Sequence, residues 1–241
     1  MKGIILAGGL GTRLYPLTYA TNKHLLPIYN QPMVFYPIQT LVNAGITSIA
    51  IVTGGPHAGH FMRVLKNGKD LGIKHLEFLY QEKEGGIADA LRLCEDFADN
   101  DSITVILGDN TTDMDIKPHV ATFKKGAKIF LKQVPDPERF GVADIKDGKV
   151  VHIEEKSKTP KSKYAVTGLY IYDGRVFDYI REIKPSGRGE FEITDVNNKY
   201  IEHDREIQHV MMNNCFWSDC GTFDSLYIAN QFWYNKKTGK S

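Results

Sequence analysis

The stretch Lys2-Gly-Ile-Ile-Leu-Ala-Gly-Gly-Leu-Gly-Thr-Arg13 begins with an apolar run and continues into a glycine-rich loop. Gly3–Ala7 is apolar at nearly every position, which is typical of a strand buried on both faces of a parallel sheet. Gly8, Gly9 and Gly11 allow a tight turn and leave backbone N–H groups free to hold phosphate oxygens. The stretch therefore predicts a buried strand followed by a phosphate-binding loop.

Further runs of β-forming residues follow, and helical patterns lie between them. Their alternation predicts an α/β fold: a doubly wound, mostly parallel Rossmann-like sheet with helices on both faces. A turn at Asp147-Gly148 predicts a hairpin within 140–156, as a small antiparallel β insert beside the main sheet. The other expected strands are Ile49–Thr53, Glu77–Tyr80, Thr104–Leu107, Lys128–Gln133 and Ala165–Tyr172, and the expected helices are 32–44, 87–97 and 222–233.

The composition is that of an ordinary globular protein. The 241 residues suit one domain. A net charge of +1 provides no global field for nucleic acid or an anionic membrane. The 3 cysteines form no CxxC pair, which argues against a disulfide framework or a zinc ribbon. No apolar run approaches the roughly 18–20 residues of a membrane span, so we expect a cytoplasmic protein.

Two common classes of glycine-rich loop do not fit. A dinucleotide fingerprint requires a third glycine where the chain has Leu14, and a P-loop requires Gly-Lys-Ser/Thr where the chain has Arg13. The loop therefore suits a phosphate but belongs to another class. A glycine-rich turn without a ligand is the alternative, and it is disfavoured because Arg13 and Lys23 follow closely.

Four charged residues are candidates for holding phosphate or a metal. Arg13 presents a planar fork to phosphate oxygens, and Lys23 a mobile point charge. Asp109 ends an apolar strand, at the edge where α/β sheets bind ligands, and a carboxylate there suits Mg²⁺. Asp219 supplies a second carboxylate. Taken alone, the two cations would be solvated surface charges and each aspartate a turn or cap residue.

The sequence closely resembles the glucose-1-phosphate thymidylyltransferase family, as a short form. The first loop alone would indicate only the wider sugar nucleotidyltransferase superfamily, but collinear motifs extend the resemblance over nearly the whole chain. They are Gly8-Gly-Leu-Gly-Thr-Arg-Leu-Tyr-Pro-Leu-Thr18, Lys23-His-Leu-Leu-Pro-Ile28, Leu107-Gly-Asp-Asn110, Asp136-Pro-Glu-Arg-Phe-Gly-Val142, Glu154-Glu-Lys156, Tyr164-Ala-Val-Thr-Gly-Leu-Tyr170, Gly189-Glu-Phe-Glu-Ile-Thr-Asp195 and Trp217-Ser-Asp-Cys-Gly-Thr222.

The resemblance implies transfer of a nucleotidyl group from dTTP to glucose 1-phosphate, with release of pyrophosphate. It implies that Asp109 and Asp219 share Mg²⁺, and we expect a homo-oligomer. The chain would then be one domain, 1–241. Its part of about 1–110 would hold the nucleotide, and its part of about 111–235 would hold the sugar phosphate and the metal. The implied nucleotide contacts are Leu6, Gly8, Gly9, Gly11, Thr12, Arg13, Gln81 and Gly86, and those to the sugar phosphate are Gly141, Glu155, Lys156 and Val166. Arg13, Lys23, Asp109 and Lys156 are the expected catalytic residues.

Three departures from the family pattern lie near the nucleotide and the metal. His24 stands where Gln is usual, Thr111-Thr-Asp113 replaces apolar or aromatic residues, and Cys220 stands where Thr is common. The same chemistry with UTP, CTP or another sugar 1-phosphate is therefore the nearest alternative. A nicotinamide-dependent oxidoreductase is opposed by the missing glycine. A non-catalytic nucleotide-sugar sensor is opposed by the presence of all four charged candidates.

Overall fold

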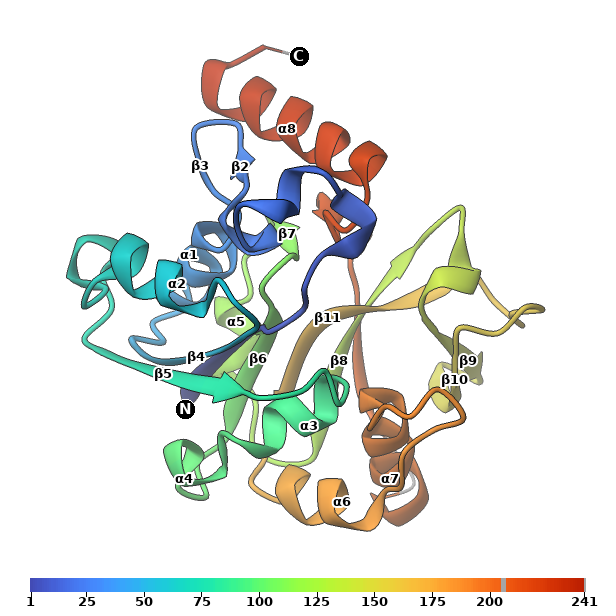
Figure 1. The fold of residues 1–241 in the computed structure, drawn as a ribbon. Helices are drawn as coiled ribbons and strands as arrows, with labels where there is room; N and C mark the ends of the chain where they lie inside the picture. Colours follow the sequence, from blue (N-terminus) through green and yellow to red (C-terminus); the bar gives the residue numbers. More distant parts are fainter. Residues whose placement is uncertain (205–206, 241) are drawn as a thin grey trace.

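A nine-stranded mixed sheet lies at the centre of the computed structural model, which describes residues 1–204 and 207–240 (Figure 1). Its main path runs β10-β9-β11-β6-β1-β4-β5, while β8 pairs with β11 and β12 pairs with β8. The strands are β1 Lys2–Ala7, β4 Ser48–Gly54, β5 His75–Gln81, β6 Ile103–Leu107, β8 Ala127–Gln133, β9 Gly141–Lys146, β10 Lys149–Glu155, β11 Tyr164–Tyr172 and β12 Gln208–Met211.

The parallel part of the sheet places the glycine-rich loop. β1 lies between β4 and β6 and pairs with both in parallel, so that Ile4 is opposite Ala50 and Val105. The carboxyl ends of β1 and β6 therefore meet at one edge, where the loop after β1 faces Asp109. β11 is antiparallel to both β6 and β8. Two small antiparallel sheets pair β2 Pro27–Ile28 with β3 Gln31–Pro32, and β7 Thr111–Thr112 with β13 Trp217–Ser218.

Helices cover both faces of the sheet, as the sequence predicts. Ile5 and Ile51 point into one core with α1 and α2, while Ile4 and Val52 point into the other with α3, α6 and α7. Alternate residues of one buried strand thus serve different cores. The helices are α1 Phe35–Asn43, α2 Ala58–Leu65, α3 Ile87–Arg92, α4 Glu95–Ala98, α5 Lys117–Ala121, α6 Val176–Glu182, α7 Ile193–Asp204 and α8 Phe223–Thr238, with 3-10 turns η1 Thr12–Leu14, η2 Leu17–Tyr19, η3 Lys23–Leu25, η4 Lys69–Leu71 and η5 Pro137–Arg139.

The six strands predicted from apolar runs are confirmed, but the helix boundaries differ. The helix expected over 32–44 begins only at Phe35, and the helix expected over 222–233 continues to Thr238. The single helix expected over 87–97 is divided into α3 and α4 at Leu93 and Cys94. Cys94 is fully buried and belongs to the core that also contains Ile4.

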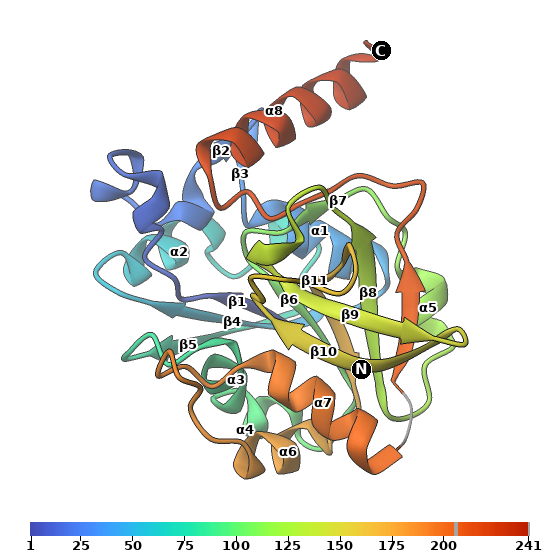
Figure 2. The same cartoon turned by 90° about the vertical axis from the view of Figure 1, so that its right-hand side faces the viewer.

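The hairpin around Asp147-Gly148 is confirmed, and the structure adds that it continues the main sheet. Both turn residues have positive φ, at 49° and 74°, as a tight turn of this kind requires. β9 pairs with β11 through Val142 and Ala165, so the hairpin forms the sheet's far edge (Figure 2). The end of the hairpin opposite the turn places Gly141 opposite Glu155, next to the Val142 that pairs with β11.

The helix α8 packs against the segment that follows the glycine-rich loop. Its Leu226 and Ala229 form a third core with Leu14, Ile28 and Tyr36 from the segment after the loop. A capping box between Thr222 and Ser225 begins the helix. Across the described part of the chain, no helix combines the length and the apolar character that crossing a membrane would require.

Candidate active site

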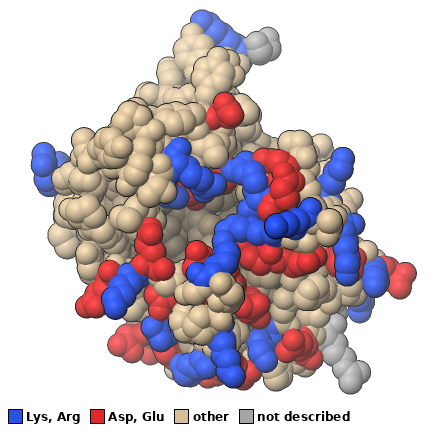
Figure 3. Space-filling view, turned by 45° about the vertical axis from the view of Figure 1, so that its right-hand side comes forward, with Lys and Arg blue, Asp and Glu red and all other residues tan. Residues whose placement is uncertain are grey.

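A cavity of about 410 Å³ lies beside the carboxyl ends of β1 and β6. Figure 3 shows Lys, Arg, Asp and Glu side chains around a hollow on this face. The cavity brings together nearly all of the site residues predicted from the sequence. Those that line it are Leu6, Gly8, Gly9, Arg13, Lys23, Gln81, Gly86, Asp109, Gly141, Glu155, Lys156, Val166 and Asp219, whereas Gly11 and Thr12 do not.

Neighbouring side chains approach the backbone closely at two of the loop glycines. A Cβ on Gly8 would lie 2.7 Å from Oε1 of Gln81, and one on Gly11 would lie 2.7 Å from Cβ of Lys23. Gly11 also has a φ of 71°, which favours glycine. Thr18 fixes the loop by donating its hydroxyl to the Gly11 carbonyl at 2.8 Å. Gly11 therefore allows Lys23 to pack against the loop.

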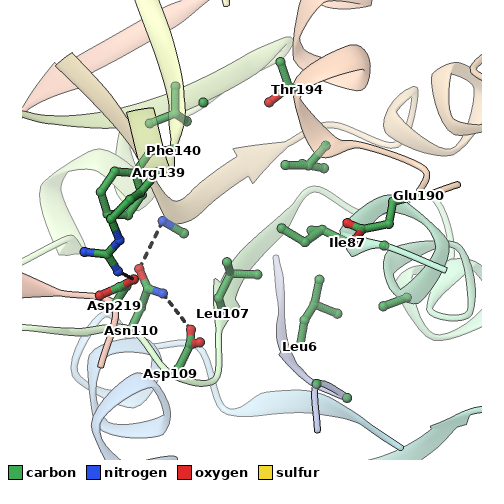
Figure 4. Close-up of a pocket in the computed structure, with 18 of the residues that line it drawn as sticks. Leu6, Ile87, Leu107, Asp109, Asn110, Arg139, Phe140, Glu190, Thr194 and Asp219 are labelled. Atoms are coloured by element: carbon green, nitrogen blue, oxygen red, sulfur yellow. Dashed lines mark hydrogen bonds and ion pairs between the residues drawn. The ribbon is translucent and has the colours of Figure 1, made fainter. Parts of the chain in front are cut away.

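Asp109 is held by a lysine and an amide. Its Oδ2 lies 2.5 Å from Nζ of Lys23, and its Oδ1 accepts from Nδ2 of Asn110 at 2.9 Å (Figure 4). Oδ1 of Asn110 in turn accepts from the Gly168 N–H at 3.0 Å and from Nε1 of Trp217 at 2.7 Å. This network ties the carboxylate to β11 and β13, so its orientation is set by segments far away in sequence.

Asp219 is held by Arg139, which the sequence reasoning missed. Nη2 of Arg139 donates to Oδ2 of Asp219 at 2.7 Å, and Nη1 donates to Oδ2 of Asp136 at 2.6 Å. The guanidinium also lies over the Phe140 ring, 5.0 Å from its centroid. Arg139 lies inside a motif that carries the family resemblance, but the spacing of that motif did not show which carboxylate it meets.

The two carboxylates have pKa values shifted in opposite directions. Burial and the negative charge of Asp109 raise the pKa of Asp219, while Arg139 and Arg13 oppose the shift. Burial alone would also raise the pKa of Asp109, but the Lys23 ammonium at contact distance brings it below its usual value. Two partly desolvated carboxylates in one cavity thus depend on nearby positive charge.

This donor set fits a hard divalent cation. Mg²⁺ is usually bound through one or two carboxylates, with waters and substrate phosphates as its remaining ligands. Asp109 and Asp219 line one cavity and interact electrostatically. In residues 1–204 and 207–240, no group of three or more His, Cys, Asp or Glu side chains could hold a metal. A two-carboxylate site that substrate completes therefore suits this cavity better than an all-protein cage.

A further group of polar side chains meets where β10 ends. Oε2 of Glu155 accepts from the Thr194 hydroxyl at 2.5 Å, and its Oε1 lies 3.6 Å from Nζ of Lys156. Arg188 also approaches Oε1, at 3.6 Å. A Cβ on Gly141 would lie 2.9 Å from the Thr194 hydroxyl oxygen, so the glycine leaves room for this contact. The result is a carboxylate flanked by two cations.

Gln81 and Gly86 form another part of the cavity wall. Nε2 of Gln81 donates to Oδ2 of Asp89 at 2.8 Å, which leaves its Oε1 beside Gly8. Gly86 has a φ of 98°, and a Cβ there would lie 2.6 Å from the Phe191 carbonyl oxygen. The backbone can therefore pass close to the α7 end of the cavity only because residue 86 is glycine.

His24 is a buried neutral side chain that lines the same cavity. Its Nδ1 lies 2.6 Å from Oδ1 of Asn22. Burial and the positive charge of Lys23 lower its pKa from 6.5 to about 3. The imidazole therefore adds no charge beside Lys23 near neutral pH.

Besides Arg139, several other lining residues were not assigned a role from the sequence. Asn110 and Trp217 lie within quoted motifs, and their hydrogen bond joins two of those motifs, a contact that the spacing does not reveal. Thr194 could have been noticed as the only hydroxyl in Gly189–Asp195. The remaining unassigned residues of the wall include Leu107, Phe140, Gly168, Tyr170, Glu190 and Ile193.

Comparisons with known proteins agree with this geometry. The sequence model of the nucleotidyl transferase family matches residues 2–236. A glucose-1-phosphate thymidylyltransferase of Mycolicibacterium smegmatis is 44% identical over 240 residues, which cover 96% of this chain and 82% of that protein. Its counterpart in Neisseria meningitidis is 42% identical, with the same shares covered.

Solved structures of nucleotidyltransferases are also similar to this chain. A Bacillus anthracis protein, provisionally assigned as a glucose-1-phosphate thymidylyltransferase and crystallised with sucrose, superposes with a TM-score of 0.91. It is 51% identical, with 96% of this chain and 94% of that chain covered. A UDP-glucose pyrophosphorylase in complex with UDP-glucose has a TM-score of 0.82 at 23% identity, which shows the shared fold. The chain therefore belongs to the nucleotidyl transferase family and is a nucleotidyltransferase enzyme.

Proposed function

We propose that the protein transfers a thymidylyl group from dTTP to glucose 1-phosphate, producing dTDP-glucose and pyrophosphate. The observation that carries the proposal is a cavity that brings together Gly8 and Gly9 of the loop, the carboxylates of Asp109 and Asp219, and four cationic side chains. The Mycolicibacterium smegmatis and Neisseria meningitidis relatives act, by their names, on these substrates. The cations that line the cavity are Arg13, Lys23, Arg139 and Lys156.

Asp109 and Asp219 are the residues that would hold Mg²⁺. The ion, when bound, would neutralise negative charge on the phosphate oxygens. Within the protein, Asn110 and Arg139 orient the two carboxylates through the hydrogen bonds described above.

The nucleotide is proposed to lie along the first half of the cavity. Backbone N–H groups of Gly8 and Gly9 and the side chain of Arg13 would hold its phosphates. Leu6, Gly11 and Thr12 would shape the loop, and Lys23, placed by Asp109, would meet charge on the leaving pyrophosphate. Gln81 would read the base edge, and Gly86 would let the backbone close on the ring.

The sugar phosphate is proposed to occupy the second half. Lys156 would contact its phosphate, and Glu155, placed by Thr194, would accept hydrogen bonds from sugar hydroxyls. Gly141 and Val166 would bound the sugar ring. The phosphate monoester is already an anionic nucleophile, so no general base is needed, and catalysis consists of positioning and charge neutralisation.

The wider arrangement is also a proposal. One domain would use residues 1–110 for the nucleotide and 111–235 for the sugar phosphate and metal, because the cavity draws its walls from both parts. We propose a cytoplasmic enzyme and a homo-oligomer. The oligomer is supported by exposed apolar side chains on α8, where Tyr227 is 63% and Ile228 54% exposed.

The test is an assay of pyrophosphate release. The protein is mixed with glucose 1-phosphate, Mg²⁺ and, in separate reactions, dTTP, UTP or CTP. We expect dTTP to give the highest kcat/KM, because the relatives are named for thymidylyl transfer. The base pocket is the part of the cavity that would distinguish the three nucleotides. A higher value with UTP or CTP would overturn the assigned nucleotide while leaving the reaction class intact.

Arg13→Ala provides the matched variant for this assay. It removes the fork for phosphate oxygens and should lower turnover by about 100-fold. Arg63→Ala, which removes an exposed arginine from α2, should leave turnover within twofold. Full activity of Arg13→Ala, with an unchanged circular dichroism spectrum, would contradict the assignment of the site.

A further inference from the structure

A second cavity, of about 520 Å³, lies away from the catalytic one. Its lining residues come from β8, β12, α5 and the turn of the β9–β10 hairpin. Its wall contains two lysines, two histidines and no acidic residue among those the structure describes. The lining residues are His119, Lys128, Gly148, Lys149, Ile207, Gln208, His209 and Val210.

Lys128 is the unusual member of this wall. The residue is only 6% exposed, although it carries an ammonium group. Its Nζ donates to the His119 carbonyl at 3.1 Å and lies 5.7 Å from the centroid of the Phe123 ring. Within the described chain, no carboxylate forms an ion pair with it. A buried cation is usually paired, so the absence of such a pair among the described residues is unusual.

The histidine beside Lys128 shows the same shortage of negative charge. Burial and the nearby Lys128 charge lower the pKa of His119, and Asp115 only partly opposes them. Burial also lowers the pKa of Lys128. An anion in the cavity would relieve both costs, because it would give the ammonium and the imidazolium an opposite charge.

The edge of the sheet supplies additional donors. β12 pairs with β8 alone among the described strands, so the other side of Gln208–Val210 has no strand partner. Such an edge leaves backbone N–H groups available to an acceptor. Acceptor oxygens and negative charge are combined in a phosphate group, which makes strong charge-assisted hydrogen bonds.

We infer that this second cavity binds a small phosphate-bearing anion, with the Lys128 ammonium and the Gln208–Val210 edge as its principal donors. The lining residues carry no role in the proposed nucleotidyl transfer. The binding site is therefore independent of the substrates, and neither proposal requires the other.

Backbone amide shifts in ¹⁵N NMR spectra of the full chain test this inference. Inorganic phosphate and pyrophosphate are titrated separately at constant ionic strength, with sodium chloride as the ionic control. We expect saturable shifts of the Gly148, Gln208 and His209 amides with at least one of the two probes. Shifts of Gly8 and Gly9 in the same spectra report the catalytic cavity separately.

Lys128→Met removes the buried ammonium and keeps an unbranched side chain. It should lower the affinity measured at the Gly148 and His209 amides at least tenfold and leave the affinity measured at Gly8 unchanged. Lys124→Met removes an exposed lysine outside the cavity and should bind within twofold of wild type. The inference is overturned if wild type gives no saturable shift at these amides, or if Lys128→Met binds as tightly as Lys124→Met.

A second variant covers the case in which Lys128→Met does not fold. His209→Glu places a carboxylate in the wall at a half-buried position, where it would repel a phosphate. It should also lower the affinity at least tenfold, and wild-type affinity in this variant would contradict the inference.

Discussion

At the residue scale, the neutral state of His24 makes stability depend on pH. The folded protein binds a proton at this imidazole only near pH 3, whereas an unfolded chain binds it near pH 6.5. As the pH falls below 6.5, the unfolded state takes up a proton that the folded state excludes, so stability is lost. The contribution falls by roughly 1.4 kcal/mol per pH unit.

His24→Gln tests this linkage, because glutamine is polar and does not titrate. Between pH 6.5 and pH 5, we expect the free energy of unfolding of wild type to fall by about 2 kcal/mol more than that of the variant. Urea unfolding of both proteins at the two pH values measures the difference. Parallel pH dependences would contradict a buried, neutral His24.

Gly86 is a second residue whose identity has a direct structural cause. Alanine there would carry a φ of 98° and a Cβ 2.6 Å from the Phe191 carbonyl oxygen. We expect Gly86→Ala to lower the free energy of unfolding by about 2 kcal/mol or more. Chemical denaturation provides the measurement.

Gly59→Ala is the matched control, because a Cβ at this position in α2 meets nothing within 4 Å. Alanine should stabilise that helix by about 0.5–1 kcal/mol. Equal effects of the two substitutions would show that residue 86 is not constrained in the way described.

At the element scale, α8 begins at a reciprocal cap. The Ser225 N–H donates to the Thr222 hydroxyl at 3.2 Å, and the Thr222 N–H donates to the Ser225 hydroxyl at 3.1 Å. Thr222→Ala should therefore cost about 1 kcal/mol of stability. Thermal unfolding compares it with Thr238→Ala, at the exposed end of the same helix, which should change stability by less than about 0.5 kcal/mol. A neutral Thr222→Ala would mean that the cap does not stabilise α8.

Sequence patterns predict the strands of this fold better than the break between α3 and α4. Strands such as β1 and β6 are predictable, because burial on both faces requires a continuous apolar run. The break between α3 and α4 is not, because Leu91, Cys94 and Phe97 maintain helical spacing across it and are all buried. An apolar pattern reports which face is buried and does not report a local change of backbone angle.

The residues of the candidate site also divide into those that the sequence predicts and those that it does not. Gly8, Asp109 and Asp219 could be selected from the sequence, since loop glycines and strand-end carboxylates have general chemical uses. Arg139 could not, because its partner Asp219 is 80 residues away. Only the folded chain brings η5 against the segment before α8.

At the scale of the whole molecule, the cavity is assembled from segments spread over most of the chain. Asp109 follows β6 and is braced by Lys23, while Asp219 follows β13 and is braced by Arg139. The sheet places these pairs at one edge, and the β9–β10 hairpin adds Glu155 and Lys156. The central claim is that both carboxylates serve the same reaction, each in its own ion pair.

Asp109→Asn and Asp219→Asn test this claim most directly, with Asp70→Asn, an exposed substitution in η4, as the control. Steady-state pyrophosphate release from dTTP and glucose 1-phosphate with Mg²⁺ is measured for all three, and circular dichroism checks their fold. We predict that each active-site variant loses about 100-fold or more in kcat, while Asp70→Asn stays within twofold of wild type. Wild-type turnover in either folded active-site variant would contradict the account.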